Sequence, residues 1–202
     1  SLQTALDQLD FAPGETIIHA HNHDLGKNVS LPGALNRLAD RGYRLLLQIH
    51  DFAEDYRPDN YSRLIEALAI DDPRRLPSVM YPQASHIWYA VLNGRDERIL
   101  GQAGLDRSRL HRLANPVSAP GPLPPRGTAR TRLLERFRVP PDRHFMLYPV
   151  RCIRRKNIGE ALLWSALAEG RVTVGLTLAP LNPAERQNYY RWRDFADSLD
   201  LP

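Results

Sequence analysis

Two basic side chains five positions apart, Arg151 and Lys156, have the chemistry to bind a negatively charged group. Lysine is rare in this chain, because all but two of the 27 basic residues are arginine, the exceptions being Lys27 and Lys156. Arginine offers a planar fork of donors, and lysine offers a mobile point charge. Asn157 follows where a helix is expected to begin, and the unpaired amide groups of a helix start attract anions.

These three sources of positive charge suit a diphosphate, which they could stabilise as a leaving group without a metal ion. The alternative is that "RCIRRK" forms an exposed turn whose charges are simply solvated. Cys152, the neighbour of Arg151, is expected to be a small buried residue, with a catalytic thiol as the alternative.

The segment "HAHNHD" supplies a second set of chemically active side chains, His19, His21 and His23. Residues two apart point to the same side of a strand, so the three imidazoles would share one face if the strand continued through them. That spacing suits zinc, and one hypothesis is a metal-dependent hydrolase. The others are that these histidines are hydrogen-bonded at a strand end, or that they line an acceptor site. Further ligands for the hydrolase would come from His50, Asp51, His86 and His111.

His50 and Asp51 end the apolar run "LLLQI", and the charged segment 53–64 after them is expected to be a loop that shapes specificity. Lys27 lies just before an expected helix, for which Ser30 would be the N-cap. Lys27 could contact an anionic acceptor, or it could belong to an ordinary surface loop.

Short apolar runs alternate with amphipathic stretches along the chain, which predicts an α/β protein with parallel sheets. A segment with five prolines and two glycines, 115–127, separates two such α/β regions. The first helix has no strand before it and the last has none after it, so the chain is expected to be a fragment. Expected strands are 16–22, 43–52, 85–93, 107–117, 144–150 and 171–179; expected helices are 2–10, 31–42, 96–105, 128–137, 157–170 and 182–199.

Composition limits the classes of protein. The formal charge of +4 and the pI near 9.4 come from basic residues that are mixed with acidic ones, so no nucleic-acid partner is expected. No apolar run reaches the roughly 20 residues needed to cross a bilayer, although peripheral membrane contact stays open. A single cysteine excludes an internal disulfide and, with no leader visible, favours a cytoplasmic location.

Five segments in order resemble the retaining GT-B glycosyltransferases of family 4, and together they cover residues 16–170. The last of them is similar to the family's pattern of an arginine followed by Lys-Gly or Lys-Asn, at Arg151, Lys156 and Asn157. The resemblance implies parts of two Rossmann-like parallel-sheet domains facing a cleft: a partial N-terminal domain at 1–120, a crossover at 121–143, and the start of a C-terminal domain at 144–202. The five segments are "TIIHAHN", "LLLQIHDF", "WYAVLNGRDERIL", "AGLDRSRLHRLANPV" and "LYPVRCIRRKNIGEALLWSAL".

The resemblance also implies an activity, the transfer of a sugar from a nucleotide-sugar donor to a glycan, lipid or small-molecule acceptor with retention of configuration. It implies no cofactor and no obligatory metal. Arg151, Lys156 and Asn157 would bind the donor diphosphate, His50 would serve catalysis near the reacting sugar, and the acceptor-side candidates are His19, His21, Lys27 and Asp51. The family's glycine-rich loop and glutamate pair have no match here, so the fragment is expected to be inactive by itself. A GT-B-like binding module without catalysis is the remaining alternative.

Overall fold

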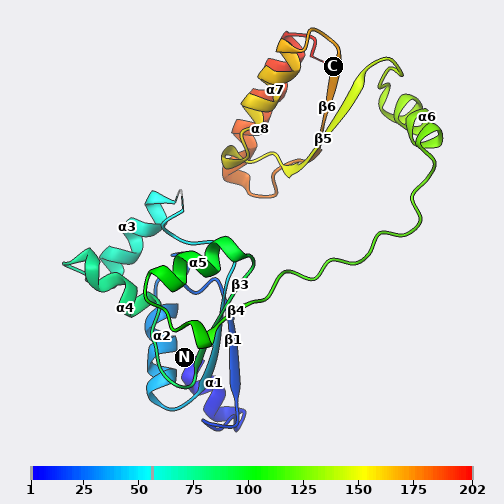
Figure 1. The fold of residues 1–202 in the computed structure, drawn as a ribbon. Coiled ribbons are helices and arrows are strands. Elements are labelled where there is room, and N and C mark those ends of the chain that lie inside the picture. The colour runs from blue at the N-terminus through cyan, green and yellow to red at the C-terminus, as the bar shows by residue number, and fades with distance from the viewer. Residues whose placement is uncertain (1, 56, 202) are drawn as a thin grey trace. The chain divides into compact units, whose positions relative to one another are not determined.

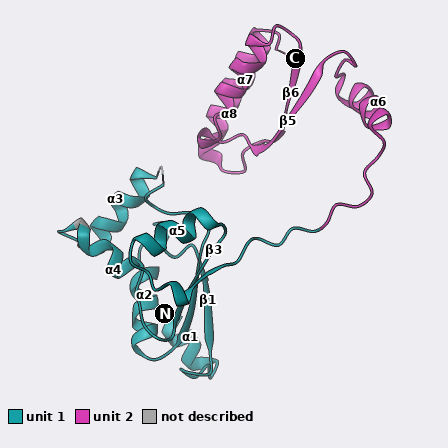
Figure 2. Ribbon diagram, viewed as in Figure 1, with its two compact units in different colours: residues 1–118 teal, residues 119–202 magenta. Residues whose placement is uncertain are grey.

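The computed structural model describes residues 2–55 and 57–201. They form two compact units, which divide between Ser118 and Ala119 and are coloured teal and magenta in Figure 2. Each unit has its own parallel sheet, so the expectation of an α/β protein with parallel sheets is confirmed. No helix within the described ranges combines the length and the apolar character that crossing a membrane requires.

The described part of the first unit has a parallel sheet in the order β1-β2-β3-β4. The strands alternate with helices, which is the pattern that the amphipathic stretches predict. The strands are β1 (Ile17–His21), β2 (Arg44–Ile49), β3 (Ile87–Val91) and β4 (Leu110–Arg112); the helices are α1 (Leu2–Gln8), α2 (Leu31–Asp40), α3 (Pro58–Ala67), α4 (Leu76–Met80) and α5 (Gly94–Gln102), with 3-10 turns at Pro73–Arg75 and Arg107–Arg109.

The two sides of this sheet differ. Leu45, Leu47 and Ile49 of β2 are fully buried in the core, against the helices. In Figure 1, α2 and α5 lie on one side of the strands. Successive side chains of a strand point to opposite sides, and register partners share a side. The opposite side therefore carries His19 level with Leu46, and His21 level with Gln48.

The second unit has a two-stranded parallel sheet within its described residues, formed by β5 (His144–Arg151) and β6 (Val172–Leu178). Its small core joins Cys152, Ile158 and Leu162 to the helix that ends the unit. The expectation that Cys152 is buried is confirmed, since its exposed fraction is 2%. The helices are α6 (Arg126–Phe137), α7 (Ile158–Leu167) and α8 (Pro183–Ser198), with a 3-10 turn at Arg154–Lys156 (Figure 1).

Strand β5 contains a bulge just before the basic turn. Tyr148 is the register partner of Leu176, but the next paired residue, Arg151, lies opposite Leu178. Three steps along β5 therefore match two steps along β6, which shifts the alternation of side chains by one residue. Pro149 lies in this interval, and proline has no amide hydrogen to give to a strand ladder.

Several elements differ from the sequence expectations. Part of the segment 53–64 is helical, because Pro58 starts α3 with a favourable backbone angle at its first turn. The strand expected over 107–117 is only Leu110–Arg112. Ser30 precedes α2 as expected, but its hydroxyl donates to Asn28 Oδ1 over 2.8 Å instead of capping the helix. Helix α7 begins at Ile158, and Asn157 before it has the left-handed φ of 50°.

Candidate functional site

His19 belongs to a chain of hydrogen bonds that crosses the sheet of the first unit. The Nε2 atom of His19 lies 2.9 Å from Gln48 Oε1, and the amide of Gln48 donates to the Leu113 carbonyl over 3.2 Å. Because the Gln48 amide nitrogen faces Leu113, its oxygen accepts, so His19 is held with its hydrogen on Nε2. Gln48 is buried and was not among the predicted residues; a polar residue inside "LLLQI" was the signal for it.

His21 and His50 form a pair of imidazoles beside this chain of hydrogen bonds. The Nδ1 atom of His21 lies 2.9 Å from Nε2 of His50, and the ring of His21 lies 4.2 Å from that of His19. A hydrogen bond between two imidazoles needs one N–H and one lone pair, so the two histidines can share one proton. The pKa of His21 is lowered, first by loss of hydration and then by the neighbouring charges of His19 and His50. The structure thus brings together three of the predicted residues.

Asn22 positions the end of the second strand. Its Oδ1 atom accepts from the backbone amides of His50, at 2.7 Å, and Asp51, at 3.3 Å. The Asp51 carboxylate forms an ion pair with Arg57 at 3.0 Å, and that guanidinium is largely buried. Asp51 therefore lies next to the histidines, but its charge is matched within the unit.

The hypothesis of three ligating histidines on one strand face is wrong. Strand β1 ends at His21, and Asn22 has a left-handed φ of 52°, which turns the chain inward. His23 is consequently buried, with its Nε2 atom 2.7 Å from the Met80 carbonyl oxygen. Among the described residues, no group of three or more His, Cys, Asp or Glu side chains is arranged to hold a metal ion.

A buried acidic cluster adjoins the histidines, and the sequence did not reveal it. Asp24 is completely buried, and its Oδ2 atom accepts a hydrogen bond from Tyr81 over 3.2 Å. The same hydroxyl lies 3.5 Å from both carboxylate oxygens of Glu54. Burial raises the pKa of Asp24 to about 7, and it also raises the pKa of Glu54. Nothing in the local sequence distinguishes Asp24 from an exposed loop aspartate, since Tyr81 lies 57 residues away.

The loop after Asp24 leads to Lys27. Leu25 and Gly26 are buried against Asn60, whose amide donates to the Leu25 carbonyl over 2.8 Å. Gly26 has a φ of +71°, and a side chain there would come within 2.6 Å of the Asn60 carbonyl oxygen. The chain then emerges at Lys27, which is exposed. Lys27 shares the end of the loop with Asn28, and the structure gives it no contact with the histidine pair.

The predicted diphosphate-binding residues lie in the second unit. Arg151 ends β5, and Lys156 closes the 3-10 turn before Asn157 and α7. Among the described residues, the Arg151 and Lys156 side chains have no ion pair or hydrogen bond to another group. Both cations are therefore free to bind an anion beside the start of a ten-residue helix. The sequence placed Arg151 at the end of a strand, as the structure does, and it placed Asn157 at the start of a helix that begins one residue later, at Ile158.

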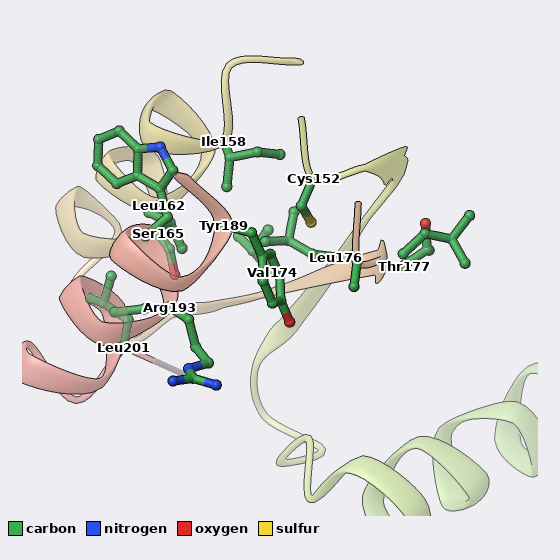
Figure 3. A pocket seen from close by; sticks show the side chains of 14 residues that line it. Cys152, Ile158, Leu162, Ser165, Val174, Leu176, Thr177, Tyr189, Arg193 and Leu201 are labelled. Carbon is green, nitrogen blue, oxygen red and sulfur yellow. The ribbon is translucent and has the colours of Figure 1, made fainter. Parts of the chain in front are cut away.

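A cavity of about 320 Å³ lies on the helix side of the same sheet. Figure 3 shows side chains from β6, α7 and α8 around it, including Val174, Ile158 and Tyr189, together with Cys152, which follows β5. Most of the lining is apolar, and Arg151 and Lys156 do not line it. Its chemistry suits aliphatic groups and does not suit a diphosphate.

A comparison with protein-family models gives no match for this chain. Over 177 residues, the chain is 30% identical to mannosylglucosyl-3-phosphoglycerate synthase of Petrotoga mobilis. The chain is similar to a glycosyltransferase. The match includes 84% of this chain but only 33% of that synthase, so the chain spans about a third of the relative's length.

Proposed function

We propose that the chain is part of a retaining GT-B glycosyltransferase of family 4, and that its second unit binds the diphosphate of a nucleotide sugar. The observation that carries the proposal is the pair of uncompensated cations, Arg151 and Lys156, at the end of a parallel strand. Ligands of open α/β sheets bind outside the carboxyl ends of the strands. The similarity to a synthase whose name describes a glycosylated product supports a sugar as the transferred group.

In this proposal, Arg151 and Lys156 neutralise the charge that develops on the departing diphosphate. Asn157 precedes the first amide groups of α7, which add donors to the same anion. The protein cations provide the stabilisation at this step, so the proposal requires no divalent metal there. His50 serves catalysis next to His21, with which it can share a proton.

The first unit is proposed to bind the acceptor. The relative's name contains 3-phosphoglycerate, which carries phosphate and carboxylate groups, and we propose an acceptor with similar anionic groups. His19 and His21 present imidazole nitrogens on the side of the sheet away from the core, and Lys27 adds a cation in the exposed loop. Asp51 contributes less charge, because Arg57 already compensates it.

Calorimetric titration with UDP, GDP and inorganic pyrophosphate tests the donor proposal. We expect binding to the unmodified chain, and a loss of about tenfold to a hundredfold in affinity for Lys156→Ala, because a hydrogen bond from a charged group is removed. Arg132→Ala is the matched control, since it removes an exposed cation from α6 in the same unit. Equal losses in both variants, or no binding of any of the three ligands, would refute the proposal.

A further inference from the structure

The backbone of the basic turn is fixed from outside by two side chains. The first is Tyr148 of β5, whose hydroxyl donates to the carbonyl oxygen of Lys156 over 2.7 Å. The Tyr148 ring is half-buried and packs against the core of Cys152, Ile158 and Leu162, so the hydroxyl is held in place. A short hydrogen bond from a packed ring restrains the carbonyl that it contacts.

The second side chain is Glu185, in the first turn of α8. Its Oε2 atom accepts from the backbone amide of Arg154 over 3.0 Å. Asn182 caps the same helix by accepting from the Ala184 amide over 3.1 Å, so the helix that carries Glu185 has a well-defined start. Glu185 thus accepts from a backbone amide at the beginning of the turn, and Tyr148 donates to a backbone carbonyl at its end.

The two contacts leave the cationic side chains unused. The turn runs from Arg154 to Lys156, and both anchoring bonds go to its backbone. The turn itself adds a bond from the Lys156 amide to the Ile153 carbonyl over 2.9 Å. A flexible lysine loses side-chain entropy on binding, and a fixed backbone reduces the additional ordering that binding requires.

We propose that Tyr148 and Glu185 are positioning residues, which hold the Arg154–Lys156 turn in the shape that presents Lys156 to a diphosphate. This inference rests on the proposed function of the turn. It assigns a ligand-binding consequence to two residues that would not touch the ligand. Removing either contact should weaken binding of a diphosphate through Lys156, and it should have no such effect once Lys156 is absent.

The test is a double-mutant cycle on the whole chain, with calorimetric titration of inorganic pyrophosphate and UDP. Tyr148→Phe removes only the hydroxyl, and we expect affinity to fall about threefold to tenfold. In the Lys156→Ala background, the same change should have no further effect, because the interaction passes through Lys156. Tyr190→Phe is the matched control, since that ring lies on the exposed surface of α8 and should keep full affinity.

Glu185 is tested by two substitutions that separate positioning from charge. Glu185→Gln keeps an oxygen that can accept from the Arg154 amide, and we expect affinity equal to or above that of the unmodified chain. Glu185→Ala loses the acceptor, and we expect about threefold weaker binding. If Glu185 acted only by repelling the anion, both variants would bind more tightly.

The outcomes distinguish the inference from the function on which it rests. Absence of pyrophosphate and UDP binding by the unmodified chain would overturn both. Binding that Lys156→Ala weakens but Tyr148→Phe and Glu185→Ala leave unchanged would overturn the positioning roles and leave the proposed function standing. Equal effects of Tyr148→Phe with and without Lys156 would also overturn the role of Tyr148, because the loss would then reflect general stability.

Discussion

The hydroxyl of Tyr81 donates to Asp24 across 3.2 Å in a part of the first unit that excludes solvent. A second carboxylate, that of Glu54, lies 3.5 Å from the same hydroxyl, and the other oxygen of Asp24 has no partner within the described residues. The neutral form of Asp24 is therefore favoured, and its pKa rises to about 7, mainly through burial. Glu54 and Asp51 add a smaller effect of the same sign. The proximity of these charges also raises the pKa of Tyr81, after burial itself.

Relative to the unmodified chain, Asp24→Asn should therefore gain free energy of unfolding as the pH rises from about 4 to about 7. The folded-state pKa of Asp24 is raised, so its contribution to stability is complete at low pH and is lost as the pH passes through 7. The full difference is on the order of 4 kcal/mol, from about 1.4 kcal/mol for each pKa unit. Urea unfolding at several pH values measures this difference. Pulse labelling of the peptides at one fixed pH assigns the unfolding to the first unit. A difference that does not change with pH would contradict the buried neutral form.

His23→Gln should show the opposite dependence. Burial lowers the pKa of His23 to about 4, so its contribution to stability is present above 6.5 and is lost as the pH falls toward 4. As the pH falls over that range, the free energy of unfolding of the variant should rise relative to that of the unmodified chain, by an amount on the order of 3 kcal/mol. The same unfolding experiment checks it. The Gln side chain can still donate to Met80, so a loss of stability at every pH would argue against titration as the cause.

The adjacent residues His23 and Asp24 thus have opposite effects on the pH dependence of stability. Between about pH 4 and 6.5, the shifts of these two groups cancel in the number of protons bound on unfolding. The variant carrying both substitutions should track the unmodified chain over that interval, with a constant offset. A pH dependence that persists in this double variant would come from the other groups whose pKa is shifted, among them Glu54, whose pKa is raised, and His21, whose pKa is lowered.

His50→Asn should raise the pKa of His21, because it removes one of the two neighbouring imidazoles whose electrostatic effect lowers it. The increase should be modest, since loss of hydration is the larger cause and remains in the variant. Titration of the histidine ring resonances by NMR measures the change. His111→Asn is the control, because His111 lies on β4, two strands beyond β2. An unchanged His21 pKa would show that the two rings do not interact in solution.

Gly159→Ala should destabilise the second unit by about 1 kcal/mol or more, as overpacking does. A side chain at Gly159 would lie 2.6 Å from Cη2 of Trp192, which packs α8 against the start of α7. Gly127→Ala is the control, since nothing lies within 4 Å of that position in α6. It should be neutral or slightly stabilising, because alanine is the better helix former. Thermal unfolding of both variants provides the comparison, and equal midpoints would refute the packing argument.

The sequence predicted the parallel α/β architecture because period and punctuation are local properties. Leu45, Leu47 and Ile49 identify a buried strand by composition, and the prolines of 115–127 mark the break between units. The basic turn was equally visible, since Arg151 and Lys156 are close in sequence. Helix α3 was missed because its residues are mostly polar, and only Pro58 marks its start.

The parts of the site that depend on distant contacts could not be predicted. The left-handed residue Asn22 changes the direction of the chain, and the neighbouring residues do not predict that turn. Because of this turn, His23 does not lie on the same strand face as His21. The prediction that the histidines share one face assumed a strand that continues through them. The Asp24 cluster needs Tyr81 and Glu54 to approach from other loops, and Gln48 becomes a relay only when Leu113 lies beside it. Tertiary packing, and not local spacing, decides these roles.

The bulge between Tyr148 and Arg151 makes this stretch of β5 sensitive to chain length. In an exposed loop, adding or removing one residue changes little, because no alternation depends on it. Here the number of residues matters: deleting one residue between Tyr148 and Arg151 would leave the arginine opposite Leu178 but would remove the bulge, and with it the local bend and twist that direct this end of β5. Homologous chains that keep an arginine at this place should therefore tolerate many substitutions at Pro149 and Val150, but no insertion or deletion.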